Sequence, residues 1–342
     1  MHEQREELRL ALVMNGGVSL AVWMGGVTNE IFRIVKGQHP VYAELLAMTH
    51  TTARVDVISG TSAGGINGAA LSLALLYRGD FARLRQVWLD TGAFASLLRA
   101  PLGYNPGSLL RGDDFFLPEI QEAFRGLARN STPIPPDVMP IDLRLTTTLL
   151  RGEQGNSVDD LGTPIHDVDY RAQFRFRNTS DKRDFKDREP LVAAISRAAR
   201  STASFPFAFE PSAVKDLGDW FVDSSDQPIA ASKLEDTQTV APRFVVDGGV
   251  LNNKPFRGAL RSIFSMPAQS GVRRVLAYIN PTRATARPAS RARTCRRFPA
   301  CWPPACSGSL NRSRSQTSSR RSRTTTTTFA RAGTACSTPS SP

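Results

Sequence analysis

Three short segments of the sequence carry residues whose types and spacing suit acyl-transfer chemistry. The first is Gly60–Gly64 (GTSAG), a G-x-S-x-G pattern between the strand-like run Val55–Ser59 and the helix-like run Ala63–Tyr77. A sharp turn from strand to helix would expose the Ser62 hydroxyl, and the two glycines let the backbone turn without crowding it. The amino end of the helix would offer N–H groups to a developing oxyanion. The pattern also fits an ordinary turn in which Ser62 only caps the helix.

The second segment, Asn15–Ser19 (NGGVS), follows the first predicted strand. Consecutive glycines at Gly16 and Gly17 let backbone N–H groups point into a concave site, where they could stabilise an oxyanion or hold a phosphate. The segment has neither the G-x-G-x-x-G spacing of a dinucleotide site nor the Gly-Lys-Ser/Thr ending of a Walker loop. A purely structural glycine turn is the alternative.

The third segment is Asp247-Gly248-Gly249, directly after the strand-like run Phe244–Val246. A carboxylate at the carboxyl end of a strand lies on the edge where open α/β sheets bind their ligands. The two glycines would allow close approach of the backbone. A simple turn that begins with Asp fits the same residues. This segment therefore indicates a catalytic site only in combination with Ser62.

The histidines decide between a catalytic triad and a dyad. An α/β-hydrolase places its acid and then its histidine after the serine, and of the four histidines only His166 follows Ser62. His166 lies in a polar segment that we predict to be a loop, with two strands still to come, so we favour an exposed loop histidine over a catalytic one. The base for Ser62 is then a carboxylate or a lysine, and Asp247 is the best placed.

Short apolar runs alternate with longer helical patterns from Leu8 to Asn280, which predicts an α/β fold with a sheet covered by helices. The pattern predicts strands over residues 8–14, 55–59, 141–150, 170–177, 244–246 and 275–279. It predicts helices over residues 19–35, 63–77, 80–89, 115–128 and 190–199. Residues 92–112, rich in Pro and Gly, are typical of a loop, and residues 131–140, with four prolines, are typical of an extended connector.

The formal net charge of +12 lies at one end of the chain. Twelve arginines and no Lys, Asp or Glu follow Asn280, whereas residues 1–280 are formally neutral. All four cysteines lie in the same terminal stretch without neighbouring histidines, so we expect no disulfide in the globular part, no zinc site and no other metal.

We therefore predict a globular domain over residues 8–280 and a basic, disordered tail over residues 281–342. One interpretation of the tail is electrostatic attraction to anionic lipid or nucleic acid. The interpretation that we favour is a frameshift product, because a GC-rich gene read out of frame gives such Arg-, Pro-, Ser- and Thr-rich sequence. A nucleic-acid partner is disfavoured, since the tail has only three aromatic residues.

The amino terminus, MHEQREE, is too acidic for a secretory signal. No run reaches the ~18 uncharged apolar residues that a membrane span requires. We expect a cytoplasmic protein with peripheral membrane contact.

The three segments together, in this order and spacing, resemble the patatin-like phospholipases, specifically a bacterial patatin-related group, over about Leu8–Asn280. That resemblance implies a three-layer α/β/α sandwich with a mainly parallel central sheet. It also implies attack by Ser62 on the acyl carbonyl of a lipid or other acyl ester, with Asp247 as general base, the Gly16 and Gly17 amides as oxyanion hole, and no cofactor.

Two features qualify the resemblance. The family places an Arg or Lys shortly after the glycine run, where this chain has Val18–Ala21, which weakens the prediction of a headgroup site there. The stretch Ala203–Pro211 resembles the family's run into Pro and Phe, and its apolar side chains would line an acyl pocket or pack in the core. The alternative function is a catalytically inactive lipid-binding or interaction module on the same fold, truncated from a longer protein.

Overall fold

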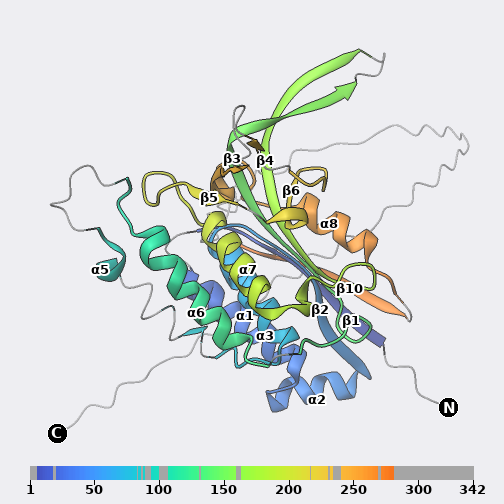
Figure 1. The fold of residues 1–342 in the computed structure, drawn as a ribbon. Helices are drawn as coiled ribbons and strands as arrows, with labels where there is room; N and C mark the ends of the chain where they lie inside the picture. Colours follow the sequence, from blue (N-terminus) through green and yellow to red (C-terminus); the bar gives the residue numbers. More distant parts are fainter. Residues whose placement is uncertain are drawn as a thin grey trace, which may run out of the picture. The chain divides into compact units, whose positions relative to one another are not determined.

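An eight-stranded sheet forms the centre of the fold (Figure 1). The computed structural model describes residues 6–17, 21–82, 84–85, 88, 94–99, 107–130, 132–158, 163–215, 217–229, 232–233, 240–268 and 271–280, without the side chains of 94–95, 155–158, 164–166, 232–233 and 240. The strands of the sheet, in chain order, are β1 (Glu6–Met14), β2 (Thr51–Gly60), β3 (Ile141–Val158), β4 (Pro164–Asn178), β5 (Ser212–Val214), β6 (Phe221–Asp223), β9 (Arg243–Asp247) and β10 (Val272–Ile279).

Four neighbouring strands run parallel, in the order β10-β1-β2-β3. The carboxyl halves of β1 and β2 are buried, over Ala11–Met14 and Val55–Gly60, because helices cover both faces of the sheet there. Such burial is usual for parallel strands. The other side of β3 continues antiparallel through β4 and β6, and β9 pairs antiparallel with β3 and β5. A separate short pair joins β7 (Ser232–Lys233) to β8 (Val240–Ala241).

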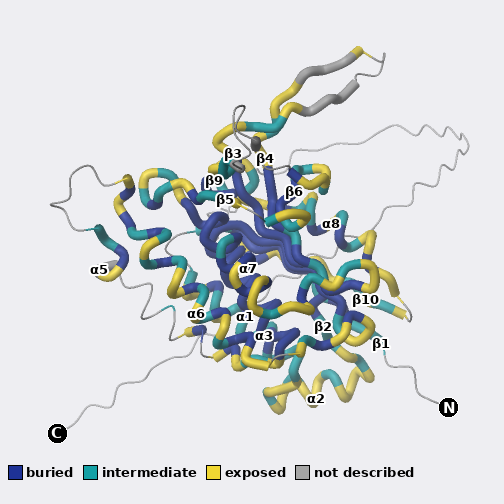
Figure 2. The backbone as a smooth tube through the Cα atoms, viewed as in Figure 1, coloured by how far each residue is buried: buried dark blue, intermediate teal, exposed yellow. Residues whose placement is uncertain are grey.

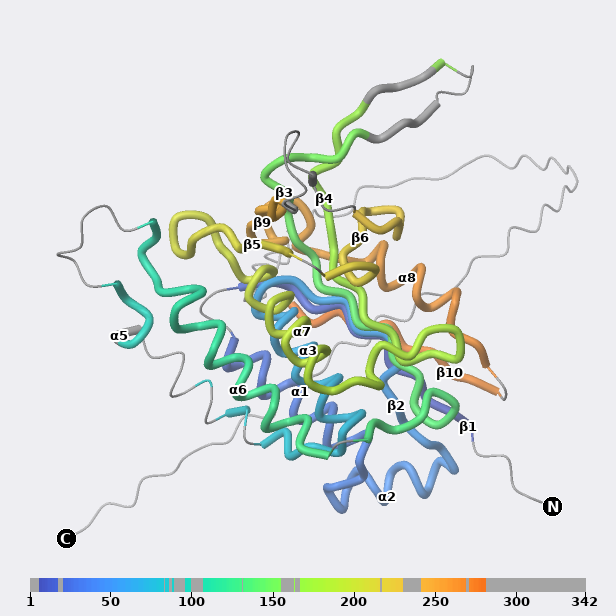
Figure 3. Tube along the Cα trace, in the orientation of Figure 1, coloured from blue at the N-terminus to red at the C-terminus, as the bar shows by residue number. Residues whose placement is uncertain are grey.

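Strands β3 and β4 form a hairpin that is longer than the sequence predicted. Pairing continues from Ile141↔Asn178 to Val158↔Pro164, with an irregularity after Thr148. The hairpin arm extends beyond the rest of the sheet (green, top of Figure 3). The expectation of a polar loop around His166 was wrong, since this residue lies in β4 opposite Asn156. The sequence there lacks the regular apolar pattern of a core strand.

Helices cover the sheet on both faces, which confirms the three-layer α/β/α sandwich. Helices α1 (Ala21–Lys36), α3 (Ala63–Leu76), α6 (Leu117–Leu127) and α7 (Arg188–Thr202) pack together on one face, and α8 (Phe256–Ser265) lies on the other. The buried part of the chain is concentrated where α3 and α7 meet the sheet (Figure 2). The remaining helices and helical turns are α2 (Pro40–Met48), α5 (Phe94–Leu97), η2 (Gly112–Phe116), η3 (Asp184–Lys186), η4 (Gly218–Trp220) and η5 (Gly248–Val250).

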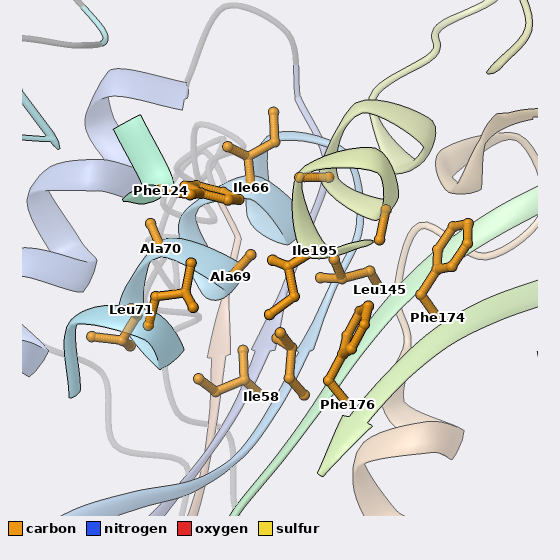
Figure 4. Close-up of a cluster of buried hydrophobic side chains, with 14 of the residues drawn as sticks. Ile58, Ile66, Ala69, Ala70, Leu71, Phe124, Leu145, Phe174, Phe176 and Ile195 are labelled. Carbon is orange, nitrogen blue, oxygen red and sulfur yellow. The ribbon is translucent and has the colours of Figure 1, made fainter. Parts of the chain in front are cut away.

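The main core is an apolar layer between the sheet and these helices (Figure 4). Helix α3 is buried along its whole length because its small residues let it lie directly on the sheet between α1 and α7. Side chains of Leu145 and Phe176 from the sheet lie beside Ile195 of α7, and Ile66 of α3 lies beside Phe124 of α6. This packing fixes the amino end of α3 at the end of β2.

Most predicted elements were confirmed, with ends shifted by a few residues. The helix predicted over residues 63–77 is α3, and the strand predicted over 275–279 is β10, which completes the sheet beside β1. Within the loop predicted over 92–112, the described residues include α5. Of the helix predicted over 80–89, the structure describes residues 80–82, 84–85 and 88, and the last three of these are helical; the tail predicted over 281–342 lies outside the described residues.

Candidate active site

Ser62 occupies a strained turn between β2 and α3. Its backbone has φ 53° and ψ −126°, a conformation that residues with a side chain rarely adopt. The turn is held from several sides, since the Thr61 N–H donates to the Met14 carbonyl at 3.1 Å and the Ser62 N–H donates to Thr202 Oγ1 at 2.9 Å. The Ser62 side chain makes no capping hydrogen bond to α3. The interpretation of Ser62 as a simple helix cap is therefore wrong.

The glycines on both sides of Ser62 stand where no side chain would fit. A Cβ on Gly64 would lie 2.5 Å from the backbone oxygens of Met14 and Asn15, and one on Gly60 would lie 2.7 Å from the Gly64 oxygen. The end of β1 thus passes directly over the start of α3, which places the segment containing Gly16 and Gly17 beside Ser62.

Strand β3 brings Asp247 to Ser62. The first part of β3 pairs with β2, ending at Gly60↔Leu145, and the next part pairs with β9, beginning at Thr147↔Asp247. Because β2 and β9 run in opposite directions, their carboxyl ends meet along the same side of β3. They are separated by two residues of β3, or roughly 7 Å. Asp247 therefore lies at the expected edge but approaches it from the opposite direction to the parallel strands.

The Asp247 carboxyl group is almost fully buried beside Ser62. Burial raises its pKa to about 6, and hydrogen bonds from the Ser62 side chain and the Gly249 N–H, the latter at 2.6 Å, oppose that rise. Gly248 and Gly249 form the turn η5 that makes this second hydrogen bond. A carboxylate with this pKa is mostly ionised at neutral pH, and it is a stronger base than an exposed aspartate.

The glycine segment after β1 lies against the same site. A Cβ on Gly16 would be 2.8 Å from the Cβ of Ser62, and the Gly16 N–H donates to Asn253 Oδ1 at 2.8 Å. Gly17 is partly buried next to it, and the structure describes no residue between Gly17 and Ala21. The Gly16 N–H thus points toward the site, where the side-chain oxygen of Asn253 accepts its hydrogen bond.

Several buried polar residues that the sequence did not single out support the two functional side chains. Ser204 accepts the Asp247 N–H through its carbonyl at 2.9 Å, and Thr148 donates its hydroxyl to the Asp247 carbonyl at 3.1 Å. Thr61 and Thr146 share a hydrogen bond of 2.7 Å between their hydroxyls. These residues carry no local motif, although three consecutive threonines in a buried strand, Thr146–Thr148, are an unusual signal.

The backbone of His166 lies far from the site along the hairpin. It pairs with Asn156, nine residues along β3 from Thr147, which pairs with Asp247. Because β3 is irregular after Thr148, the same span covers only six residues of β4, from Ala172 to His166, or on the order of 20 Å at roughly 3.3 Å per residue. Elsewhere in the described residues, no group of three His, Cys, Asp or Glu side chains is arranged to hold a metal ion.

The comparison with known families agrees with this geometry. The family model for the patatin-like phospholipases matches residues 12–260, a range that contains Gly16, Ser62 and Asp247. The chain belongs to the patatin-like phospholipase family. Membership in this family indicates, in general terms, hydrolysis of lipid acyl esters.

The patatin-like phospholipase domain is also similar to a mycobacterial protein. It is 37% identical over 306 residues to Uncharacterized membrane protein Rv3479 of Mycobacterium tuberculosis, and the match covers 81% of this chain and 28% of that protein. The chain therefore spans under a third of this relative's length. Within the described residues of the present chain, no helix has the length and apolarity needed to cross a membrane.

Proposed function

We propose that this patatin-like phospholipase domain is a serine acyl hydrolase that cleaves fatty-acyl esters of lipids through a Ser62–Asp247 dyad. The observation that carries the proposal is the buried Asp247 carboxylate beside a serine held on a strained strand-to-helix turn. Backbone strain of this kind is kept where it serves a function. The position of His166 along the hairpin supports a dyad over a triad.

The chemistry follows from the two side chains. Ser62 Oγ attacks the acyl carbonyl carbon while its proton passes to the Asp247 carboxylate. As the tetrahedral intermediate collapses, the carbon–oxygen bond to the leaving group breaks, and Asp247 returns the proton to the alcohol or lysolipid. A water molecule then loses a proton to Asp247 and attacks the acyl-enzyme, and Ser62 regains its proton when the fatty acid leaves.

The developing oxyanion needs N–H donors that point into the site. We propose the Gly16 and Gly17 amides for this role, because Gly16 contacts Ser62 and its N–H already donates to an oxygen atom. The substrate oxyanion would replace Asn253 Oδ1 as the acceptor at Gly16. The amino end of α3 adds its dipole to the same region.

The decisive experiment measures fatty-acid release from p-nitrophenyl acyl esters and from phosphatidylcholine vesicles. We expect Ser62→Ala and Asp247→Asn each to lower kcat by about a thousandfold or more, as losses of catalytic serines and carboxylates do. Asp226→Asn is a matched control, since Asp226 is also a partly buried carboxylate but pairs with Arg144 and Arg175 away from Ser62.

A fluorophosphonate probe separates the hydrolase from an inactive lipid-binding module. Only an activated serine reacts with it rapidly, so we expect labelling of the wild type and none of Ser62→Ala. A folded wild type that neither reacts with the probe nor cleaves any ester would favour the binding module. Near-normal activity in Asp247→Asn would exclude the dyad.

A further inference from the structure

The loop between α7 and β5 presents an unusual aromatic side chain to solvent. Phe207 is 95% exposed and has φ 69°, in the left-handed region that residues with a side chain rarely adopt. Phe205 and Leu109 are exposed beside it, and the Leu109 N–H donates to the Phe207 carbonyl at 3.3 Å. We call these three residues the Phe207 rim. Of the Phe residues in Ala203–Pro211, only Phe209 enters the core, where it stacks on Phe116.

A polar cluster beneath the rim holds it in place. Glu210 accepts hydrogen bonds from Ser108 Oγ at 2.6 Å and from the Asp113 N–H at 2.7 Å, and it pairs with Arg99 and Arg200 at 3.2 Å. These contacts tie the segment 108–113 to the segment 205–210. The two segments that carry the rim are thus joined below it, and its three apolar side chains face solvent.

The rim lies close to the proposed active site. Thr202 accepts the Ser62 N–H and Ser204 accepts the Asp247 N–H, so the chain runs from the site to Phe207 within five residues, at most about 18 Å. The segment that follows Asp247 at this edge of the sheet also has exposed apolar side chains, at Val250 and Leu251. The free energy of an exposed phenylalanine side chain falls when its apolar surface moves from water into an apolar phase. A left-handed backbone conformation at such a residue is found mainly at functional sites.

We propose that the Phe207 rim inserts into the surface of a lipid bilayer and brings the edge with Ser62 to its substrate. The inference rests on the proposed function in one respect, namely that the substrate is a lipid held in such a surface. Ser62 is only 7% exposed and Asp247 only 2%, so a lipid must leave the bilayer to reach them. Aromatic and aliphatic side chains at the boundary of headgroups and acyl chains are the usual means of such docking.

The chain offers a matched control at the other end of the sheet. Phe264 is 86% exposed, near the end of α8, and Pro267 shortly after it accepts a hydrogen bond from Arg9 in the amino half of β1. Phe264 is thus as apolar and nearly as exposed as Phe207, but it lies away from the edge that carries Ser62. A general attraction of exposed phenylalanines to lipid would affect both residues equally.

The test measures, by co-sedimentation, how strongly the full chain partitions onto phosphatidylcholine vesicles. The Ser62→Ala variant serves as the parent, so that binding is measured without turnover. Neutral lipid and about 1 M NaCl suppress binding by the terminal arginines, since the Debye length is then about 3 Å. We expect Phe207→Ala to lower the partition coefficient about tenfold, as loss of most of one buried aromatic side chain implies. We expect Phe207→Trp to raise it, and Phe264→Ala to leave it within about twofold.

Equal binding by the Ser62→Ala parent and its Phe207→Ala derivative, or an equal loss in Phe264→Ala, would overturn the proposal. Thermal unfolding with an unchanged midpoint shows that each variant is folded, which excludes exposure of apolar surface by misfolding as the cause of a gain in Phe207→Trp. Because binding is measured without turnover, a failure of the hydrolase proposal would leave this result unchanged. Conversely, if the enzyme is active but substitutions in the Phe207 rim do not change vesicle binding, only the docking proposal is refuted.

Discussion

The raised pKa of Asp247 makes a prediction about stability that does not depend on any substrate. Burial raises this pKa from 3.8 to about 6 in the folded protein. Below about pH 4 the carboxyl group is neutral in both the folded and the unfolded chain. Between pH 4 and 6 the unfolded chain ionises first, so the free energy of unfolding falls as the pH rises, by about 3 kcal/mol in total. Above about pH 6 the loss is complete.

Asp247→Asn removes this titration while keeping the shape of the side chain. Its oxygen can still accept the Gly249 N–H, which donates to Asp247 Oδ1 in the wild type. We therefore expect the variant to gain stability relative to the wild type as the pH rises from 4 to 7, by about 3 kcal/mol, although it loses activity. The assay is urea unfolding followed by tryptophan fluorescence at intervals from pH 4 to pH 8.

Asp226→Asn provides a comparison of opposite sign. Asp226 is partly buried, yet its hydrogen bonds and ion pairs with Arg144 and Arg175 outweigh burial and lower its pKa. This variant should therefore lose stability near neutral pH. If the difference between Asp247→Asn and the wild type does not change with pH, the carboxylate is not destabilised by its surroundings, and the reasoning about the base is wrong.

Four further predictions concern the site and its supports. The kcat/KM for a soluble ester should rise with pH and level off above about pH 6, as Asp247 ionises; a profile flat down to pH 4 would contradict this. Gly64→Ala should lower the free energy of unfolding by about 1–3 kcal/mol and reduce activity, since its Cβ would lie 2.5 Å from the Asn15 oxygen. Glu210 has a pKa lowered to about 2, because its hydrogen bonds and the charge of Arg200 outweigh burial. Its stabilisation is present above about pH 4.5 and is lost toward pH 2, so Glu210→Gln should cost about 1–2 kcal/mol at pH 7, allowing for solvent screening, and less in acid. His166→Ala should keep full activity, and a loss in kcat beyond about tenfold would favour a triad that includes His166.

The sequence alone singled out Ser62 as a candidate nucleophile because the geometry of its turn is local. A serine between two glycines, after an apolar strand and before an Ala/Leu-rich helix, predicts a sharp turn, and the described turn at Ser62 is sharp, with φ 53°. The lack of a suitable histidine after Ser62 left a carboxylate or a lysine as the predicted base. The helices and the parallel strands followed from periodicity for the same reason, since each pattern lies within one continuous segment.

The sequence did not reveal which segments would meet. Three features depend on pairings between residues far apart in the chain. They are the direction of β9, the extension of β3 and β4 into a hairpin arm, and the contact of Gly16 with Asn253. Phe205 and Phe207 carry the same side chain as the buried Phe209, and only the folded structure shows that they face solvent.

The sequence thus predicted Ser62 as the candidate nucleophile, its turn and the class of fold. The tertiary structure decided how Asp247 is brought beside Ser62 and how strong a base its carboxylate is. The physical reason is that a pKa of about 6 for Asp247 arises from burial, and burial is a property of every element packed around the carboxylate, not of the Asp-Gly-Gly segment that contains it.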